Sequence, residues 1–292
     1  MYSAKIIADS INPVGDRITT FELTYPRFVH AELMTHRLFS RNSASSRALP
    51  TKKLLEQIEN NPVMPKFWGK NQSGMQAAEE LTGEDLAAAK DEWLMQRDEA
   101  VIAAKNMHAI GLHKQIANRV LEPWMFITVI VTATEYENWF HLRCSPMAQP
   151  EIAWVAYEMQ KLYKENKPVT MHRGGWHLPY VELSDTGNPL FVDVYGLANG
   201  VGVHPHDTPE VIKLLCKIST ARCGRVSYLT HAGVRDYSKD IELHDRLSES
   251  GHWSPFEHVA EAMDKSEMSG NFKGWKQYRK NFKGEHAGRQ LP

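Results

Sequence analysis

Residues 35–47, THRLFSRNSASSR, combine three arginines, a histidine and an asparagine with five hydroxyl-bearing side chains. Such a segment offers many hydrogen-bond donors and few carbons to bury, so it would make a poor core. Guanidinium and hydroxyl groups are the usual partners of phosphate and of planar anions. The segment therefore indicates an anion-binding loop, although a solvated helix end followed by a serine-rich turn would have the same composition.

Two further arginines stand in separate motifs. Arg119 lies in NRVLEP and Arg143 lies in FHLRCSPMAQPEI. A single arginine is most often one half of a surface ion pair. Several arginines grouped with loop hydroxyls favour instead a site for phosphate or for the edge of a pyrimidine, because guanidinium makes planar two-point contacts.

The histidines and cysteines give weaker indications. His172 and His177 in HRGGWH, and His204 and His206 in HPH, form the densest histidine pairs, but no pair has HExxH or Cys/His zinc spacing. No metal site is therefore predicted. Cys144 follows Arg143, and a neighbouring cation can lower a thiol pKa. No base is evident beside it, so a packed or incidental thiol is the preferred interpretation.

Composition limits the class of protein. The chain has 292 residues, a net charge of -1, 42% hydrophobic and 24% charged residues, which is ordinary for a globular protein. This balance gives no electrostatic footprint for duplex nucleic acid or an anionic membrane. The N-terminus resembles neither a signal peptide nor a spanning helix. The three cysteines include no CxxC pair, which suits a reducing compartment, and a cytoplasmic location is expected.

The elements that must position these residues follow from periodicity and turn residues. They are strands at 4–11 and 16–26, helices at 27–39 and 51–60, one or two surface helices at 84–116, a buried strand at 124–134 and helices at 148–163, 208–223 and 239–250. Thr208 is the expected N-cap of one helix, and Gly251 is expected to end another. A loop leading into a strand is expected at 254–263, and a final helix at 271–285. The anion-binding motif should lie at a helix end and in the loop after it.

Several motifs together resemble the flavin-dependent thymidylate synthase family. HRLFSRNSASSR is similar to its signature, Arg-His-Arg-x-x-Ser-x-Asn-Glu-x-Ser-x-Arg. FHLRCSPMAQPEI resembles the family segment Leu-Arg, spacer, Ala-Gln-x-Glu-Ile, and GHWSPFEH resembles Gly-His-x-[Ser/Thr]-Pro-Phe-Glu-His. CGRVSY and NRVLEP also match family segments. The positions in step with the signature are His36, Arg37, Ser40, Asn42, Ser45 and Arg47.

The order of these motifs differs from that of the family. There the Ser-Pro-Phe-Glu-His segment precedes the arginine signature, whereas here it lies near the C-terminus. The resemblance therefore implies a circular permutation, which proteins tolerate when their termini lie close together. The implied fold is α+β, a sheet with flanking helices, in a single domain over residues 1–292. The Gly-, Pro- and His-rich stretch at about 172–206 is interpreted as an insertion or linker.

The resemblance also implies a function: transfer of a one-carbon unit from methylenetetrahydrofolate to C5 of a deoxypyrimidine monophosphate, converting dUMP to dTMP. It implies FAD as cofactor, NADPH as reductant, and a tetramer with shared active sites. His252 and Glu257 match one wall of the pocket. The implied catalytic residue is Arg143, the substrate contacts are Glu32, Ser43, Ser45, Arg47, Arg119 and Arg143, and the cofactor contacts are Thr35, His36, Arg37, Thr132, Thr134, Asn138, Ser227, His252 and Ser254.

The signature departs from the family pattern at several positions. Thr35 replaces the first arginine, Ser43 the glutamate, Glu32 a glutamine and Ala48 a tyrosine. These changes leave the acceptor base and the product open. One alternative is a hydroxymethylase acting on dUMP or dCMP, in which water completes the methylene transfer. Another is an inactive relative that binds nucleotide or RNA, with the basic segment 273–289 supplying phosphate contacts.

Overall fold

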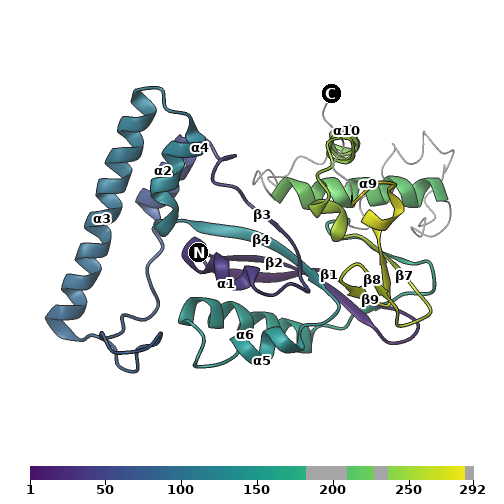
Figure 1. Cartoon of the computed structure of the whole chain (residues 1–292), viewed down its shortest axis with the longest axis horizontal. Coiled ribbons are helices and arrows are strands. Elements are labelled where there is room, and N and C mark those ends of the chain that lie inside the picture. Colours follow the sequence, from purple (N-terminus) through teal and green to yellow (C-terminus); the bar gives the residue numbers. More distant parts are fainter. Residues whose placement is uncertain (182–208, 227–235, 287–292) are drawn as a thin grey trace.

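The computed structural model describes residues 1–181, 209–226 and 236–286 (Figure 1). Its centre is a five-stranded sheet with the strand order β3-β4-β2-β1-β5. The predicted hairpin at the N-terminus is confirmed, with Gly15 at a φ of 93° in its turn. The strands are β1 Ser3–Ile11, β2 Arg17–Pro26, β3 Ser40–Ser43, β4 Phe126–Ala133 and β5 Val169–Thr170.

Two helices, α5 (Glu137–Arg143) and α6 (Pro150–Glu165), pack on one face of this sheet (Figure 1). The α6 helix was predicted from its apolar spacing, and its buried stripe packs against β2 and β4. Phe21 and Trp139 are almost fully buried there, and each such side chain stabilises the fold by roughly 1.5–3 kcal/mol. This apolar layer fixes α5, and therefore Arg143 at its C-terminal end.

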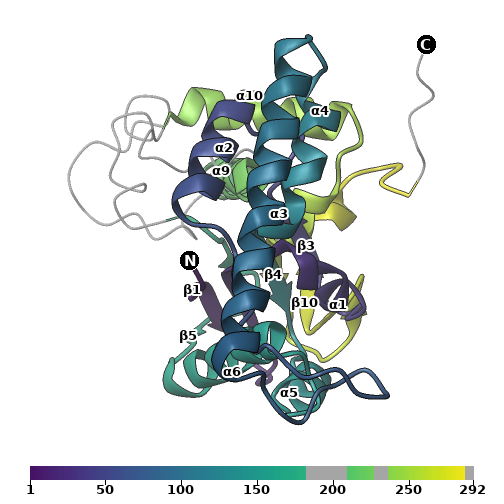
Figure 2. The ribbon, with the colours of Figure 1, turned by 90° about the vertical axis from the view of Figure 1, so that its left-hand side faces the viewer.

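A helical arm stands at one end of the sheet. It consists of α2 (Thr51–Asn60), α3 (Gly83–Ala109), α4 (Lys114–Ala117) and the 3-10 segment η2 (Asn118–Trp124). Figure 2, which faces this end, shows α3 across the front with α2 and α4 beside it. Leu54, Ile58 and Leu121 form part of its buried core. The helices predicted at 51–60 and within 84–116 are confirmed.

The C-terminal unit lies at the other end of the sheet (Figure 1). Helices α9 (Pro209–Arg225) and α10 (Tyr237–Glu249) pack beside a three-stranded sheet of order β10-β7-β6. Both helices were predicted, and Gly251 follows α10 at a φ of 73°. The remaining elements are β6 Trp176–His177, η4 Ser254–Glu257, β7 Ala260–Ala262, β8 Met268–Ser269, β9 Phe272–Lys273, β10 Trp275–Gln277 and η5 Tyr278–Asn281.

Two predicted helices are wrong. The final helix expected at 271–285 is instead short strands followed by η5, and Gly274, at a φ of 73°, packs so closely on Asp16 that an added Cβ would lie 2.3 Å from a carboxylate oxygen. The helix expected at 27–39 is only a 3-10 turn, η1 (Arg27–Val29), and α1 (His30–Met34). The second half of the signature forms strand β3. The expected N-cap Thr208, with His204 and His206, lies outside the described residues.

The C-terminal unit is joined to the main sheet at strand β3, where η4 packs against it. Ser40 Oγ lies 3.3 Å from Gln277 Nε2, and Asn42 Nδ2 donates to the carbonyl of Cys223 at 2.7 Å. Lys273 N donates to Thr134 Oγ1 at 3.0 Å. The segment containing SPFEH therefore meets the arginine signature in space, as the motif comparison predicts, although more than two hundred positions separate them.

A buried chain of hydrogen bonds reinforces this junction. It connects Ser10, His177, Thr20, Thr132 and His258, with distances of 3.0, 2.8, 2.7 and 2.8 Å. All five side chains are buried. Burial lowers the pKa of both His177 and His258 to about 3, so both imidazoles are neutral and serve as hydrogen-bonding links between the two sheets.

Candidate functional site

The first group of predicted site residues gathers around Arg143, the last residue of α5 (the Arg143 cluster). Its Nη1 donates to a carboxylate oxygen of Glu32 at 2.7 Å, and its Nε donates to Nε2 of His36 at 3.1 Å. Its Nη2 donates to Thr35 Oγ1 at 3.3 Å and to the carbonyl of Glu32 at 3.4 Å. Four predicted residues from two distant segments therefore meet, and two of them, Glu32 and Thr35, are departures from the family signature.

The hydrogen bonds fix the protonation of this cluster. Because Arg143 donates to Nε2 of His36, that nitrogen must keep its lone pair. Burial, with the charges of Arg143 and Arg41 beside it, lowers the pKa of His36 to about 4, so the imidazole is neutral at neutral pH. Burial raises the pKa of Glu32, while Arg143 opposes that shift. The cluster holds one guanidinium in a fixed plane against α1.

Arg41 was not singled out by the sequence, although it lies inside the signature. Its Nη1 donates to the carbonyl of Met34 at 2.8 Å and to that of His36 at 3.2 Å. These carbonyls end α1, so Arg41 stabilises the turn that carries Thr35 and His36. Glu257 of η4 acts electrostatically on Arg41, which links the C-terminal unit to the same turn.

A second group of polar side chains, of which Arg119 was predicted, lies around Glu122 of η2 (the Glu122 group). Glu122 accepts from Arg119 Nη1 and from Ser46 Oγ, both at 2.7 Å, and lies 3.5 Å from Arg27 Nη2. Sequence reasoning named Arg119 but missed Glu122, which stands three residues later in the same NRVLEP motif. Beside this group is a cavity of about 460 Å³ lined by Arg27, Phe28, His30, Ala31, Arg119, Glu122 and Pro123.

The turn after β3 carries Ser45 and Arg47 and rests on η2. Asn118 Nδ2 donates to the carbonyls of Ser46 and Leu49 at 2.7 and 3.1 Å, and Arg47 N lies 3.3 Å from Ser45 Oγ. Arg47 is exposed, and no ion pair is seen for it in the described part of the chain. The turn therefore presents a cation and a hydroxyl beside Arg119, a suitable arrangement for an anion.

The remaining predicted residues lie outside these two groups. Arg37, Asn138, His252 and Ser254 are exposed, and His252 Nδ1 lies 2.7 Å from Ser250 Oγ. Glu257 pairs with Arg279. Ser43 lies on β3 opposite Val129. Thr132 and Thr134 already hydrogen-bond within the protein, so a ligand contact would require either hydroxyl to exchange a partner. Ser227 lies outside the described residues.

The histidine and cysteine indications have structural explanations. No group of three or more metal-ligating side chains occurs within residues 1–181, 209–226 and 236–286. His177, one of the paired histidines, belongs to the buried chain described above. Burial raises the pKa of Cys144, which disfavours a thiolate there. None of the described helices is long and apolar enough to cross a membrane.

Residues 17–169 match the family described as thymidylate synthase complementing protein. The match covers 153 of 292 residues, more than half of the chain, and includes all of the Arg143 cluster and the Glu122 group. The chain belongs to this family, whose members are flavin-dependent thymidylate synthase-type enzymes. A comparison with curated proteins returns no match. The C-terminal unit lies outside the matched residues.

Proposed function

We propose that this protein transfers a one-carbon unit from methylenetetrahydrofolate to C5 of dUMP, giving dTMP, with FAD as cofactor and NADPH as reductant. The observation that supports this most directly is the Arg143 cluster. A partly buried, hydrogen-bonded guanidinium of fixed orientation is suited to a two-point contact with the edge of a pyrimidine. Family membership supports the flavin-dependent class of the reaction.

In this proposal Arg143 activates the base electrostatically. Its positive charge favours the N3 anion of the pyrimidine and so raises electron density at C5, where the new bond forms. One of the two N–H groups of Nη1 makes none of the contacts described above. The hydrogen bonds of Nη2, at 3.3 and 3.4 Å, are long enough to be replaced by a bond to an oxygen of the base. Neutral His36 keeps the guanidinium oriented without adding a competing charge. No cysteine nucleophile is required.

The phosphate of the nucleotide is proposed to bind at the turn after β3. Arg47, Ser45 and Arg119 supply two cations and a hydroxyl, and Asn118 holds the turn in place. Because Arg47 has no acidic partner among the described residues, its charge is available to an anion.

The side chains around the signature fit a flavin nucleotide in their donor chemistry. Arg37 is exposed without an ion pair among the described residues. Thr35, Asn138 and Ser254 add hydroxyl and amide donors and acceptors, and His252 adds an imidazole. A pyrophosphate requires a cation and hydroxyl or amide donors, and an isoalloxazine edge requires both donors and acceptors. When bound, the reduced flavin would supply the hydride that completes a methyl group. Arg37 would hold the pyrophosphate, and Asn138 and Ser254 would orient the ring.

An assembly with shared active sites is supported by apolar side chains around Arg143. Met34, Leu38, Leu142 and Met147 are 44%, 43%, 49% and 71% exposed, and exposed apolar clusters of this kind often mark protein interfaces. A second copy of the chain would cover them and would enclose the nucleotide. We propose a tetramer, as in the resemblance that the sequence shows, and a circularly permuted chain whose SPFEH segment returns to the signature.

The decisive experiment is a reaction of the purified protein with dUMP or dCMP, methylenetetrahydrofolate, FAD and NADPH in oxygen-18 water, with mass spectrometry of the nucleotide product. The proposal expects 5-methyl-dUMP without label. Absence of any modified nucleotide from a protein that binds FAD and dUMP would contradict it.

A second candidate, hydroxymethyl transfer with dCMP as a possible acceptor, is favoured by one observation. Glu32 and Thr35 stand at Arg143 where the family has an amide and a cation, and a carboxylate accepts readily from the 4-amino group of cytosine. Fewer cations beside the base also leave room for water to complete the methylene transfer. Oxygen-18 in a 5-hydroxymethyl product would establish this alternative.

A further inference from the structure

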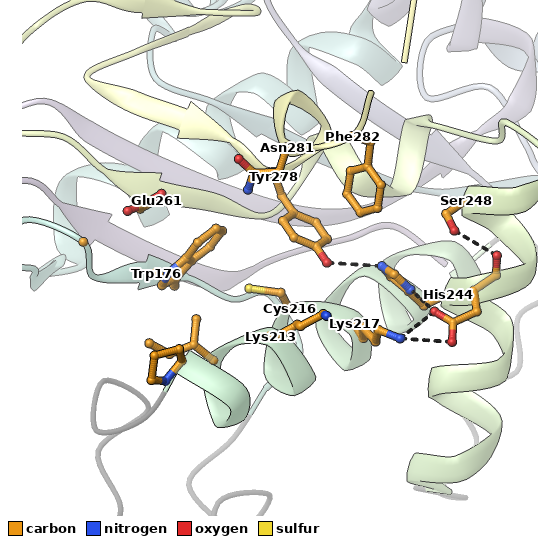
Figure 3. Close-up of a pocket in the computed structure, with 14 residues that line it drawn as sticks. Trp176, Lys213, Cys216, Lys217, His244, Ser248, Glu261, Tyr278, Asn281 and Phe282 are labelled. Atoms are coloured by element: carbon orange, nitrogen blue, oxygen red, sulfur yellow. Dashed lines mark hydrogen bonds and ion pairs between the residues drawn. The ribbon is translucent and has the colours of Figure 1, made fainter. Parts of the chain in front are cut away.

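A large cavity lies in the C-terminal unit, away from the Arg143 cluster. It has a volume of about 690 Å³ and is enclosed by helices α9 and α10 on one side and by β6, β7 and η5 on the other (Figure 3). Every residue that lines it falls between Gly174 and Phe282, outside the residues matched to the family. Nothing in the proposed reaction uses it.

One wall of this cavity is aromatic. The rings of Trp176 and Tyr278 lie 5.9 Å apart, and those of Tyr278 and Phe282 lie 5.1 Å apart, both edge to face. Edge-to-face pairing holds each ring in a defined plane (Figure 3). Tyr278 is buried and stacks on Phe256, so the partly exposed rings of Trp176 and Phe282 present surface to the cavity. Such faces suit a flat, heteroaromatic ligand.

The polar groups on the α10 side are already satisfied by one another. The hydroxyl of Tyr278 lies 3.3 Å from His244 Nε2, His244 Nδ1 lies 2.7 Å from Asp245, and Lys217 bonds both oxygens of Asp245 at 2.7 and 3.0 Å (Figure 3). Burial lowers the pKa of His244 and raises that of Tyr278, so His244 is neutral and Tyr278 keeps its proton. The Tyr278–His244–Asp245–Lys217 chain therefore fixes this wall and leaves little capacity for a ligand.

Two charged groups that line the cavity are left over, one on each wall. Lys213 of α9 and Glu261 of β7 make no ion pair within the described ranges 1–181, 209–226 and 236–286. The carboxylate of Glu261 lies beside Gly174, where an added Cβ would be 3.9 Å from Oε1. A ligand that spans the cavity can therefore meet an anion at one end, ring faces between, and a cation at the other.

Hydrogen-bond chemistry limits the kinds of ring that can donate two bonds to the carboxylate of Glu261. A carboxylate accepts two parallel bonds only from an edge with two adjacent N–H donors. Adenine and cytosine place a ring-nitrogen acceptor beside their amino group, and uracil flanks its single N–H with two oxygens. The 2-amino-4-oxopyrimidine edge, shared by guanine and pterins, presents N–H and NH₂ side by side. Lys213 then requires an anionic group at the far end of the ligand.

We propose that this cavity is a second ligand site, which binds a guanine-type ring that carries an anionic tail, either a guanine nucleotide or a pterin with a carboxylate tail. Glu261 binds the donor edge, Trp176, which lies opposite Glu261 on the neighbouring strand, contacts the ring, and Lys213 binds the phosphate or carboxylate. The site is separate from the one in which Arg143 would act, so its existence does not depend on the proposed reaction.

The test is isothermal titration calorimetry of the full chain with GMP and with pteroylglutamate, each up to about 1 mM, a concentration that detects sub-millimolar affinities. The ligand that binds shows whether the cavity takes a guanine nucleotide or a pterin. AMP, which lacks the donor edge, should bind at least about tenfold more weakly than GMP, and guanosine, which lacks the anion, should lose a similar factor.

Variants assign the contacts. Glu261→Gln and Lys213→Gln should each weaken binding by about tenfold or more, whereas Lys90→Gln, at an exposed lysine on helix α3 of the arm, should not. Lys213→Gln should leave guanosine binding unchanged. Thermal melting checks that each variant is folded. Arg47→Ala, which alters the proposed dUMP phosphate site, should leave GMP binding at this cavity intact. No binding of either ligand, or binding that neither Glu261→Gln nor Lys213→Gln weakens, overturns the inference without affecting the proposed function.

Discussion

Two regions of the molecule each combine a cation, a carboxylate and an imidazole, but in different arrangements. In the Arg143 cluster, a guanidinium is central and contacts both a carboxylate, Glu32, and an imidazole, His36. In the wall of the second cavity, a carboxylate, Asp245, is central and contacts both an ammonium, Lys217, and an imidazole, His244. Both imidazoles are neutral, because burial lowers the pKa of each.

The two arrangements leave different atoms available to a ligand. A central arginine has five N–H donors in one plane, so its partners can orient it while N–H groups still face outward. A central carboxylate surrounded by donors has its oxygens occupied, and the chain around it becomes a fixed wall. The first arrangement is suited to contact a substrate directly, whereas the second is suited to hold a cavity in shape. The following predictions test that distinction.

Replacement of Arg143 should have the largest effect. Arg143→Lys removes the planar contacts to Glu32, Thr35 and His36, and an ammonium cannot reproduce the two-point contact with a base. Loss of one preorganised electrostatic contact costs about 10²–10³ in kcat. Steady-state kinetics with dUMP would measure this loss.

The matched control is the neighbouring residue. Cys144→Ser changes a partly buried thiol whose pKa is raised by burial, and it should keep most of the activity. If Cys144→Ser lost more activity than Arg143→Lys, a cysteine-nucleophile mechanism would replace the one proposed.

Replacement of Arg47 should have the next largest effect. Arg47→Ala removes a cation from the turn after β3 and should weaken dUMP binding by about 2 kcal/mol, the scale of a charge-assisted hydrogen bond. Calorimetry would measure the affinity. Lys52→Ala, at an exposed lysine on nearby α2, is the control and should have little effect. Equal affinities for folded Arg47→Ala and the parent chain would remove Arg47 from the site.

The protonation of His36 should make the Arg143 cluster sensitive to acid. The folded protein holds this imidazole neutral down to a pKa of about 4, whereas the unfolded chain binds a proton near pH 6.5. The stabilisation is therefore present above pH 6.5 and is lost as the pH falls from 6.5 towards 4. Between pH 7.5 and pH 5 this group should cost about 1–2 kcal/mol of unfolding free energy.

Urea unfolding of the parent chain and of His36→Gln at both pH values would measure that loss. The side-chain oxygen of glutamine can accept from Arg143 but does not titrate, so the variant should lose less stability at pH 5 than the parent. His177 and His258 contribute equally to the pH dependence of both chains, so they do not affect the difference between the two. Identical pH dependence in the two chains would show that the folded protein does not lower the pKa of His36.

The smallest effect is expected for Glu32→Gln, which keeps the shape of the side chain but removes its charge. A carboxylate disfavours the oxygen at C4 of uracil and accepts from the amino group of cytosine. The substitution should therefore raise the preference for dUMP over dCMP by about 1 kcal/mol, or about fivefold. Competition binding with the two nucleotides would measure the ratio. A shift towards dCMP would place Glu32 away from position 4 of the base.

The sequence predicted elements well where one physical factor dominates. The β1–β2 hairpin follows from its turn residues, the buried strand β4 from its run of β-branched apolar residues, and helix α6 from helical spacing. All three are present. The Arg143 cluster was predicted only as a set of candidate residues. Their contacts depend on α1 and α5 packing into the same core, with Leu33 and Trp139 in one cluster, which local pattern cannot show.

The errors have identifiable causes. In the basic segment 271–285, buried Phe272, Trp275 and Tyr278 pack against distant parts of the chain, and that packing overrides local helix propensity. Gly270 and Gly274, both at positive φ, were available indications of turns. Strand β3 was missed because its side chains are polar, and its strand character comes from pairing with β4 and from cover by η4.

The packing of η4 on β3 also has a consequence for how the chain is made. Strand β3 is an edge of the main sheet, and its cover is encoded more than two hundred residues later. During synthesis, the ribosome therefore releases an open sheet edge long before residues 254–257 emerge. Open edges pair readily with other chains, and contacts of such long sequence separation form slowly. A nascent chain that stalls before its last forty residues should be far more prone to aggregate than the finished protein.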